Sequence, residues 1–106
     1  MADFYRICKT CPPTLDDFKS PQELGKRTRP PKYSEKSWAS VSMHTTREGA
    51  VKQRERWPNL GDFIAQVAIP DAVEWVQDGE EDLTHYELWA LAGDLLGWVV
   101  QTTKIE

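Results

Sequence analysis

The stretch DFIAQVAI, residues 62–69, decides which fold this sequence is expected to adopt. Successive side chains of an extended chain point to opposite faces, and here one face is entirely apolar. That face carries Phe63, Ala65, Val67 and Ile69. Pro70 follows and ends the segment, because proline lacks the N–H that a sheet hydrogen bond needs. The pattern predicts a strand packed against a core.

Other segments are predicted to pair with this strand. Residues 4–8, 38–44 and 98–105 are rich in aromatic and β-branched residues, and residues 73–76 form a weaker strand pattern. Residues 84–89 fit either a helical turn or an ordered loop.

Helix start signals lie between the predicted strands. Thr14–Asp17 and Ser20–Glu23 both have the spacing of a capping box, in which a hydroxyl and a carboxylate cap the first helical turn. A longer helix is predicted to begin at Thr45 or Thr46 and to run to about Trp57, with Trp57 turned inward.

The order of these elements predicts the fold class. The order is a strand, short helices, a basic loop at residues 26–37, a strand, a helix and several more strands. This order indicates an α+β fold with a mainly antiparallel sheet. The regular strand–helix–strand succession of a doubly wound sheet is missing. A chain of 106 residues is expected to form a single domain over residues 1–106.

Composition indicates an ordinary globular protein. Apolar residues make up 40% of the chain and charged residues 28%. No apolar run reaches the roughly 20 residues of a membrane span, so no membrane association is expected. The first residues, MADFYR, lack the pattern of a signal peptide, and the expected location is therefore the cytoplasm.

The net charge of −4 is distributed unevenly. Residues 1–60 hold 12 Lys or Arg against 7 Asp or Glu, whereas residues 61–106 hold 1 against 10. The basic half could meet an anionic ligand such as a nucleotide, or the two halves could neutralise one another across the fold. General nucleic-acid binding is not expected of a net acidic chain.

Two cysteines have the CxxC spacing of redox pairs and metal knuckles. A zinc site would need two more ligands, and His44 and His85 do not have the spacing of a compact zinc finger. We therefore expect no metal site, with Cys8 as a small core residue and Cys11 in a loop.

Two groups of polar residues are candidates for a functional site. On the predicted strand 38–44, Ser40, Ser42 and His44 share one face. This face suits hydrogen bonds to a ribose or phosphate, and the alternative interpretation is a polar edge that faces solvent. Later in the chain, His85 and Glu87 place a base and a carboxylate two residues apart, and they are the candidate catalytic residues.

Over residues 4–70 the chain resembles the ADP-ribosyltransferase superfamily, including the RES-type toxins that consume NAD. The resemblance rests on the opening FYR at residues 4–6, the basic loop, SVS at residues 40–42, and the strand-to-helix step at residues 42–50. The chain also resembles a group of small bacterial proteins, a likeness that says nothing about activity.

The resemblance implies an NAD cofactor and roles for particular residues. Arg6 would hold a phosphate or ribose, Ser40 and Ser42 would line the pocket, and Arg27 or Arg29 would add a phosphate contact. The chain departs from the family where a Glu-x-Glu or Gln-x-Glu pair is expected on a late strand, and Glu87 and Glu74 are the stand-ins.

Two functions follow as hypotheses. The first is a small NAD-handling enzyme that transfers ADP-ribose or cleaves the nicotinamide bond, and it predicts that Arg6 and one carboxylate converge on a pocket. The second is a non-enzymatic domain that binds a protein partner, and it predicts an exposed apolar patch around some of the five tryptophans.

Overall fold

Strands from both halves of the chain form one antiparallel sheet. The computed structural model describes residues 1–25 and 27–106, and within them six strands pair in the order β4-β5-β2-β1-β3-β6. The strands are β1 (Ala2–Cys8), β2 (Val41–His44), β3 (Phe63–Ile69), β4 (Glu74–Gln77), β5 (His85–Trp89) and β6 (Val99–Lys104). The α+β class and the antiparallel sheet are confirmed.

The helices are short and lie between the strands. They are α1 (Pro21–Leu24), α2 (Glu35–Trp38), α3 (Arg47–Arg56) and α4 (Ala92–Gly97), with single 3-10 turns η1 (Leu15–Phe18) and η2 (Pro58–Leu60). Both predicted capping boxes are present, at the start of η1 and of α1. Thr46 caps α3, because its hydroxyl accepts a hydrogen bond from the Gly49 N–H at 3.0 Å.

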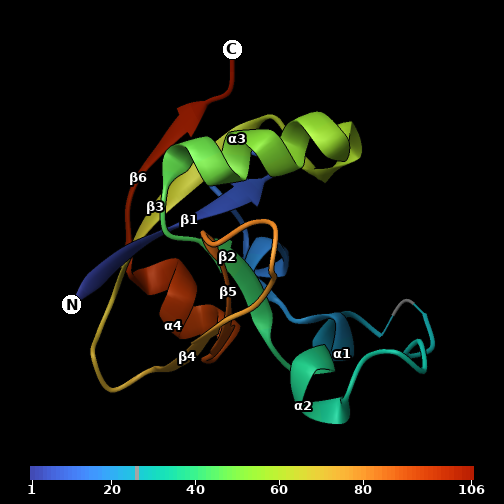
Figure 1. The fold of residues 1–106 in the computed structure, drawn as a ribbon. Coiled ribbons are helices and arrows are strands. Elements are labelled where there is room, and N and C mark those ends of the chain that lie inside the picture. The colour runs from blue at the N-terminus through green and yellow to red at the C-terminus, as the bar shows by residue number, and fades with distance from the viewer. Residues whose placement is uncertain (26) are drawn as a thin grey trace.

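The sheet has a core on each face, and Figure 1 shows α3 and α4 on opposite sides of it. The larger core, on the α4 side, includes Phe4, Phe18, Met43, Val67, Leu88 and Leu95. The smaller core lies under α3 and consists of Ile7, Ala50, Ile64 and Ile105. Burying each large side chain stabilises the fold by about 1.5–3 kcal/mol, so both cores hold α3 and α4 on the sheet.

Strand β3 has the predicted orientation. It pairs with β1 along its whole length, from Ala2 opposite Ile69 to Cys8 opposite Phe63. The face predicted to be apolar belongs to the larger core, while Ile64 belongs to the smaller one. Cys8 is buried, as predicted, and Cys11 lies outside the strands and helices, also as predicted, where it is exposed.

The segment around residue 38 differs from its prediction. Residues 38–44 were expected to be one strand, but β2 begins only at Val41, because Glu35–Trp38 forms α2. The Ser34 hydroxyl caps this turn by accepting a hydrogen bond from the Ser37 N–H at 3.0 Å. Ser40 therefore precedes the strand and does not share its face with Ser42 in the way predicted.

Three further features of the structure differ from the sequence-based predictions. Residues 84–89 contain a strand, β5, and not a helical turn or loop. The helix α4 was not predicted at all, and it shortens the last predicted strand to Val99–Lys104. Trp57 lies just beyond α3 and is 59% exposed, so its predicted inward orientation is wrong.

The described residues, 1–25 and 27–106, contain no helix with both the length and the apolar character needed to cross a membrane.

Candidate functional site

The pairing of β2 with β5 brings polar residues from two distant parts of the chain together. Ser42 lies directly opposite Glu87, and His44 lies directly opposite His85. Side chains of directly opposed residues project from the same face of a sheet. Tyr5 of β1 is opposite His44, and its ring packs against the smaller core, so all these side chains are on the α3 side.

The first cavity, which we call the β2–β5 groove, has a volume of about 310 Å³. Its floor includes Ser42 and Glu87, and its wall comes from the segment around α2. The wall residues are Arg27, Tyr33, Ser37, Trp38 and Ser40.

The wall of the β2–β5 groove is ordered by contacts among its own residues. The Arg27 guanidinium carbon lies 5.1 Å from the centre of the Trp38 ring, and the rings of Tyr33 and Trp38 are 5.6 Å apart. The Ser37 hydroxyl donates a hydrogen bond to the Glu87 carboxylate. A cation, two flat rings and a held carboxylate therefore face one small volume.

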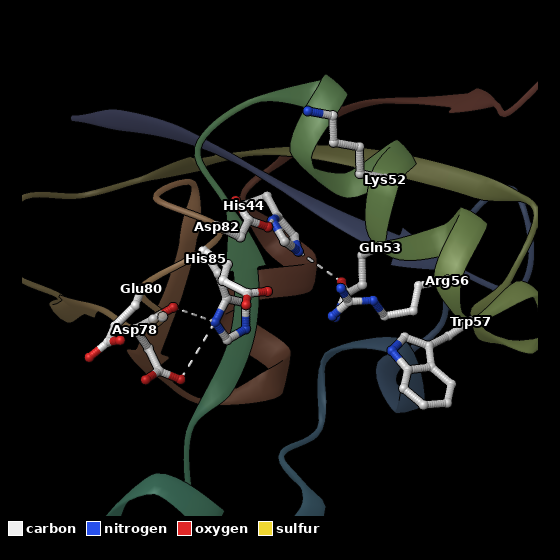
Figure 2. Close-up of a pocket in the computed structure, with 11 residues that line it drawn as sticks. His44, Lys52, Gln53, Arg56, Trp57, Asp78, Glu80, Asp82 and His85 are labelled. Carbon is white, nitrogen blue, oxygen red and sulfur yellow. Dashed lines mark hydrogen bonds and ion pairs between the residues drawn. The ribbon is translucent and has the colours of Figure 1, made fainter.

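The second cavity, which we call the α3 cleft, has a volume of about 650 Å³ and adjoins the groove. One wall is formed by Gln53 and Arg56 of α3 and by Trp57 just beyond the helix, and the other is the acidic loop at residues 78–82. Figure 2 shows His85 between these walls. Gln53, Asp78 and His85 line both cavities, so the two cavities adjoin at these residues.

His85 is oriented by the turn that precedes it. Its Nδ1 lies 2.8 Å from the main-chain carbonyl oxygen of Asp78 and 3.5 Å from a carboxylate oxygen of the same residue. A carbonyl oxygen can only accept, so Nδ1 carries the proton and the neutral ring keeps a lone pair on Nε2. The Asp78 N–H in turn donates to the His85 carbonyl at 2.8 Å. A histidine held in this tautomer can act as a general base.

His44 is a structural residue at the back of the α3 cleft. It is 2% exposed, with Nε2 at 2.8 Å from the Gln53 side-chain oxygen and Nδ1 at 3.1 Å from the Thr84 hydroxyl. An Asp82 carboxylate oxygen lies 3.3 Å from the same Nδ1. Burial lowers the pKa of His44, which favours the neutral ring.

Arg6 lies outside both cavities. It follows Tyr5 on β1, so its side chain projects from the opposite face of the sheet to Ser42 and His85. Its Nε donates to the Asp17 carbonyl at 2.9 Å, and its Nη1 donates to the Ser42 carbonyl at 2.7 Å. Arg6 therefore joins β1, β2 and η1 from the α4 side.

Most of the other predicted site residues line one of the two cavities. The groove brings together Arg27, Ser40, Ser42, His85 and Glu87. The adjoining cleft adds His44.

Two other predicted residues are bound elsewhere. Arg29 donates to the Tyr33 carbonyl and lines neither cavity. Glu74, the other stand-in carboxylate, lies on β4 with its carboxylate 2.8 Å from the Lys36 amine.

Sequence reasoning missed the contribution of α3. Arg56 was predicted to lie on an exposed helical face and it is exposed, but its place in the wall of a cavity was not expected, and Gln53 and Asp78 were not singled out. A signal was present, because Gln53 and Arg56 are three residues apart and therefore neighbours on one side of a helix. Only the position of the acidic loop shows that this side faces a cavity.

No protein-family model, curated protein or solved structure matches this chain. Among residues 1–25 and 27–106, no three histidine, cysteine, aspartate or glutamate side chains gather closely enough to hold a metal ion.

Proposed function

We propose that this protein is a small NAD-handling domain of the ADP-ribosyltransferase-like type, and that its β2–β5 groove binds the nucleotide. One observation carries the proposal. Ser42 and Glu87 face each other across paired strands in a groove that also holds Arg27 and His85. A hydroxyl, a carboxylate, a cation and a base then act on one bound molecule.

The groove residues suit the parts of a nucleotide. The flat rings of Tyr33 and Trp38 offer surfaces on which a base or nicotinamide ring can stack. Arg27 supplies a charge for a phosphate, and the Ser42 hydroxyl can hydrogen-bond a ribose. The volumes of the two cavities fall in the size range of small-molecule sites.

The chemistry would centre on Glu87. As the bond between ribose and nicotinamide breaks, positive charge develops on the ribosyl carbon, and a fixed carboxylate beside it lowers the barrier. The hydrogen bond from Ser37 holds that carboxylate in place. His85 Nε2 can accept the proton of an attacking water or acceptor hydroxyl.

The test is one-dimensional proton NMR of NAD mixed with the protein, following both line broadening and free nicotinamide. Glu87→Gln keeps the size of the side chain and removes its charge, so we expect nicotinamide release to fall about 100-fold or more. Glu74→Gln is the matched control, because it removes the same charge from a strand residue outside both cavities. It should release nicotinamide at the native rate.

Either of two results would overturn the proposal. The first is neither broadening nor nicotinamide at millimolar NAD. The second is equal release from the Glu87→Gln and Glu74→Gln variants, which would remove Glu87 from the chemistry.

A non-enzymatic interaction domain is the second candidate function. Trp57 is 59% exposed and Leu60 is 40% exposed, and both lie beyond the end of α3, so an apolar contact is available there. The other tryptophans are buried or half-buried. The NAD experiment separates the two functions, because an interaction domain predicts neither broadening nor release.

A further inference from the structure

We propose that the side-chain amide of Gln53 turns over when His44 gains or loses a proton. The pH then decides whether the meeting point of the two cavities offers a hydrogen-bond donor or an acceptor. The inference goes beyond the proposed function, because it needs no assumption about which ligand occupies the cavities.

His44 is buried among groups that hydrogen-bond both of its ring nitrogens. The residue is 2% exposed. Its Nδ1 faces the loop between β4 and β5, at 3.1 Å from the Thr84 hydroxyl and 3.3 Å from Oδ2 of Asp82. Its Nε2 faces α3, at 2.8 Å from the Gln53 side-chain oxygen, and Figure 2 shows this bond.

The Nδ1 atom of His44 keeps its proton in both charge states of the ring. A hydroxyl has a single hydrogen, and Thr84 donates it to Oδ1 of Asp82 at 2.6 Å. The Thr84 oxygen can therefore only accept from His44, and so can the Asp82 carboxylate. Because Nδ1 faces two acceptors, the neutral ring carries its proton there, and Nε2 is the nitrogen that titrates.

The amide of Gln53 has to match the state of Nε2. A protonated Nε2 donates to the amide oxygen, which is the arrangement in the structure. A neutral Nε2 has a lone pair, so the same orientation would place two acceptors 2.8 Å apart. Turning the amide by half a rotation presents its NH2 group as a donor instead. The terminal torsion of glutamine is two-fold, and its oxygen and nitrogen are similar in size, so the turn needs no repacking.

The charges around His44 act in both directions. Asp82 of the loop and the Gln53 oxygen favour the protonated ring. His85 of β5, whose ring centre is 5.3 Å away, and Arg6 of β1 favour the neutral ring. Burial has the largest effect, and it lowers the pKa of His44. The neutral ring therefore predominates at neutral pH, and the protonated ring forms on acidification.

Two cations of α3 also line the α3 cleft. They are Lys52, which Figure 2 shows directed away from the His44 ring, and Arg56, which lies three residues after Gln53. Positive charges near an imidazole disfavour its protonated form. Both cations therefore act in the same direction as burial.

The turn of the amide changes the surface of both cavities. Gln53 lines the α3 cleft and the β2–β5 groove, so the amide atom that does not bond His44 is left to them. With the neutral ring this atom is the oxygen, which accepts hydrogen bonds. With the protonated ring it is the NH2 group, which donates them. Neutral pH thus favours a ligand with an N–H or O–H group at this point, and acidic pH favours one with an acceptor oxygen.

The test is an NMR titration of the isotope-labelled native protein between about pH 4 and 9. The nitrogen shifts of the ring report which atom carries a proton, and the nuclear Overhauser effect reports how close the Gln53 NH2 lies to the ring. On raising the pH, we expect Nε2 to lose its proton while Nδ1 keeps one. The Overhauser effect from the NH2 to the ring should strengthen with the same midpoint.

A substitution at Gln53 tests the coupling from the other side. Gln53→Glu keeps the size of the side chain but accepts only, so it should raise the midpoint of the His44 titration by about one pH unit or more. Gln101→Glu is the matched control, because it adds the same charge on β6, outside both cavities. It should move the midpoint by no more than about 0.3 pH units, because solvent screens a distant charge.

Three results would overturn the inference. One is a neutral ring that carries its proton on Nε2. Another is an Overhauser effect that stays constant through the titration, or a ring that does not titrate over this range. The third is an equal shift of the midpoint in the Gln53→Glu and Gln101→Glu variants.

Discussion

Replacing Gly49 with alanine tests how tightly α3 is packed against the loop that closes the α3 cleft. In an open helix this change is favourable by about 0.5–1 kcal/mol, because glycine loses more backbone freedom on folding than alanine. Here the added methyl carbon would lie 2.1 Å from the Thr84 hydroxyl oxygen, 3.0 Å from the Thr84 Cβ and 3.2 Å from His44 Nδ1. The distance to the Thr84 hydroxyl oxygen is far inside van der Waals contact, and the other two contacts are tight.

The hydroxyl of Thr84 cannot simply rotate away. It bonds an Asp82 carboxylate oxygen at 2.6 Å and faces His44 Nδ1 at 3.1 Å, so moving it breaks at least one of these contacts. Overpacking of this kind costs about 1–3 kcal/mol. A lost hydrogen bond adds about 0.5–1.5 kcal/mol, against the small gain in helix propensity. We expect Gly49→Ala to reduce the free energy of unfolding by about 1–3 kcal/mol, with the sign opposite to that of an exposed helical glycine.

The assay is urea denaturation followed by tryptophan fluorescence. A loss of this size lowers the midpoint by roughly 0.5–1.5 M for an m-value of about 2 kcal/mol per molar. In the double variant with Thr84→Ala, which removes the hydroxyl, the cost of Gly49→Ala should shrink, because the nearest contact is gone. A midpoint that rises in Gly49→Ala, or a cost unchanged by Thr84→Ala, would refute the packing described for this loop.

Three other perturbations have equally specific outcomes. Burial lowers the pKa of His44 in the folded protein. The stability that the neutral His44 ring contributes is therefore complete above its unfolded pKa of about 6.5, and it is lost as the pH falls below that value. Urea midpoints between pH 7 and pH 5 should therefore fall less in His44→Gln than in the native protein. Arg6→Met should lower the free energy of unfolding by at least about 1.5–3 kcal/mol, because two carbonyls lose a charged donor. Its NAD affinity should change less than that of Arg27→Met, because Arg27 lines the groove and Arg6 does not. Equal losses of affinity in the two variants would contradict the placement of Arg6 on the far face. Burial also raises the pKa of the Cys8 thiol to about 12, so iodoacetamide should modify Cys11 and spare Cys8 in the native protein. Mass spectrometry would identify the modified cysteine. Rapid labelling of both cysteines would contradict the burial of Cys8.

Local features of the chain were predicted well, because their physical causes are local. The alternation in residues 62–69 requires one apolar face whatever the partner strand is, and β3 has that face. Ser20 caps α1 through a side chain and an N–H three residues apart, so the signal is complete within one turn. The burial of Cys8 followed from its place at the end of an apolar strand.

Short elements with weak local signals were not predicted. The strand β5 is stable because it pairs with both β2 and β4, and neither partner is visible in the sequence of residues 84–89. The helix α4 contains two glycines, and Leu95, which is fully buried, holds it against the sheet. Tertiary packing overrides a weak propensity of this kind.

The sequence by itself determined which residue types would be available to a site, and it singled out Arg27, Ser42, His85 and Glu87, which the groove brings together. Only the tertiary structure decided which of them face one another. The register of β1 against β2 sets Tyr5 opposite His44 and so turns Arg6 to the other face. Side chains alternate along a strand, so a shift of one residue in that register would exchange the two faces. Such pairing joins segments far apart in the chain, and no local pattern encodes it.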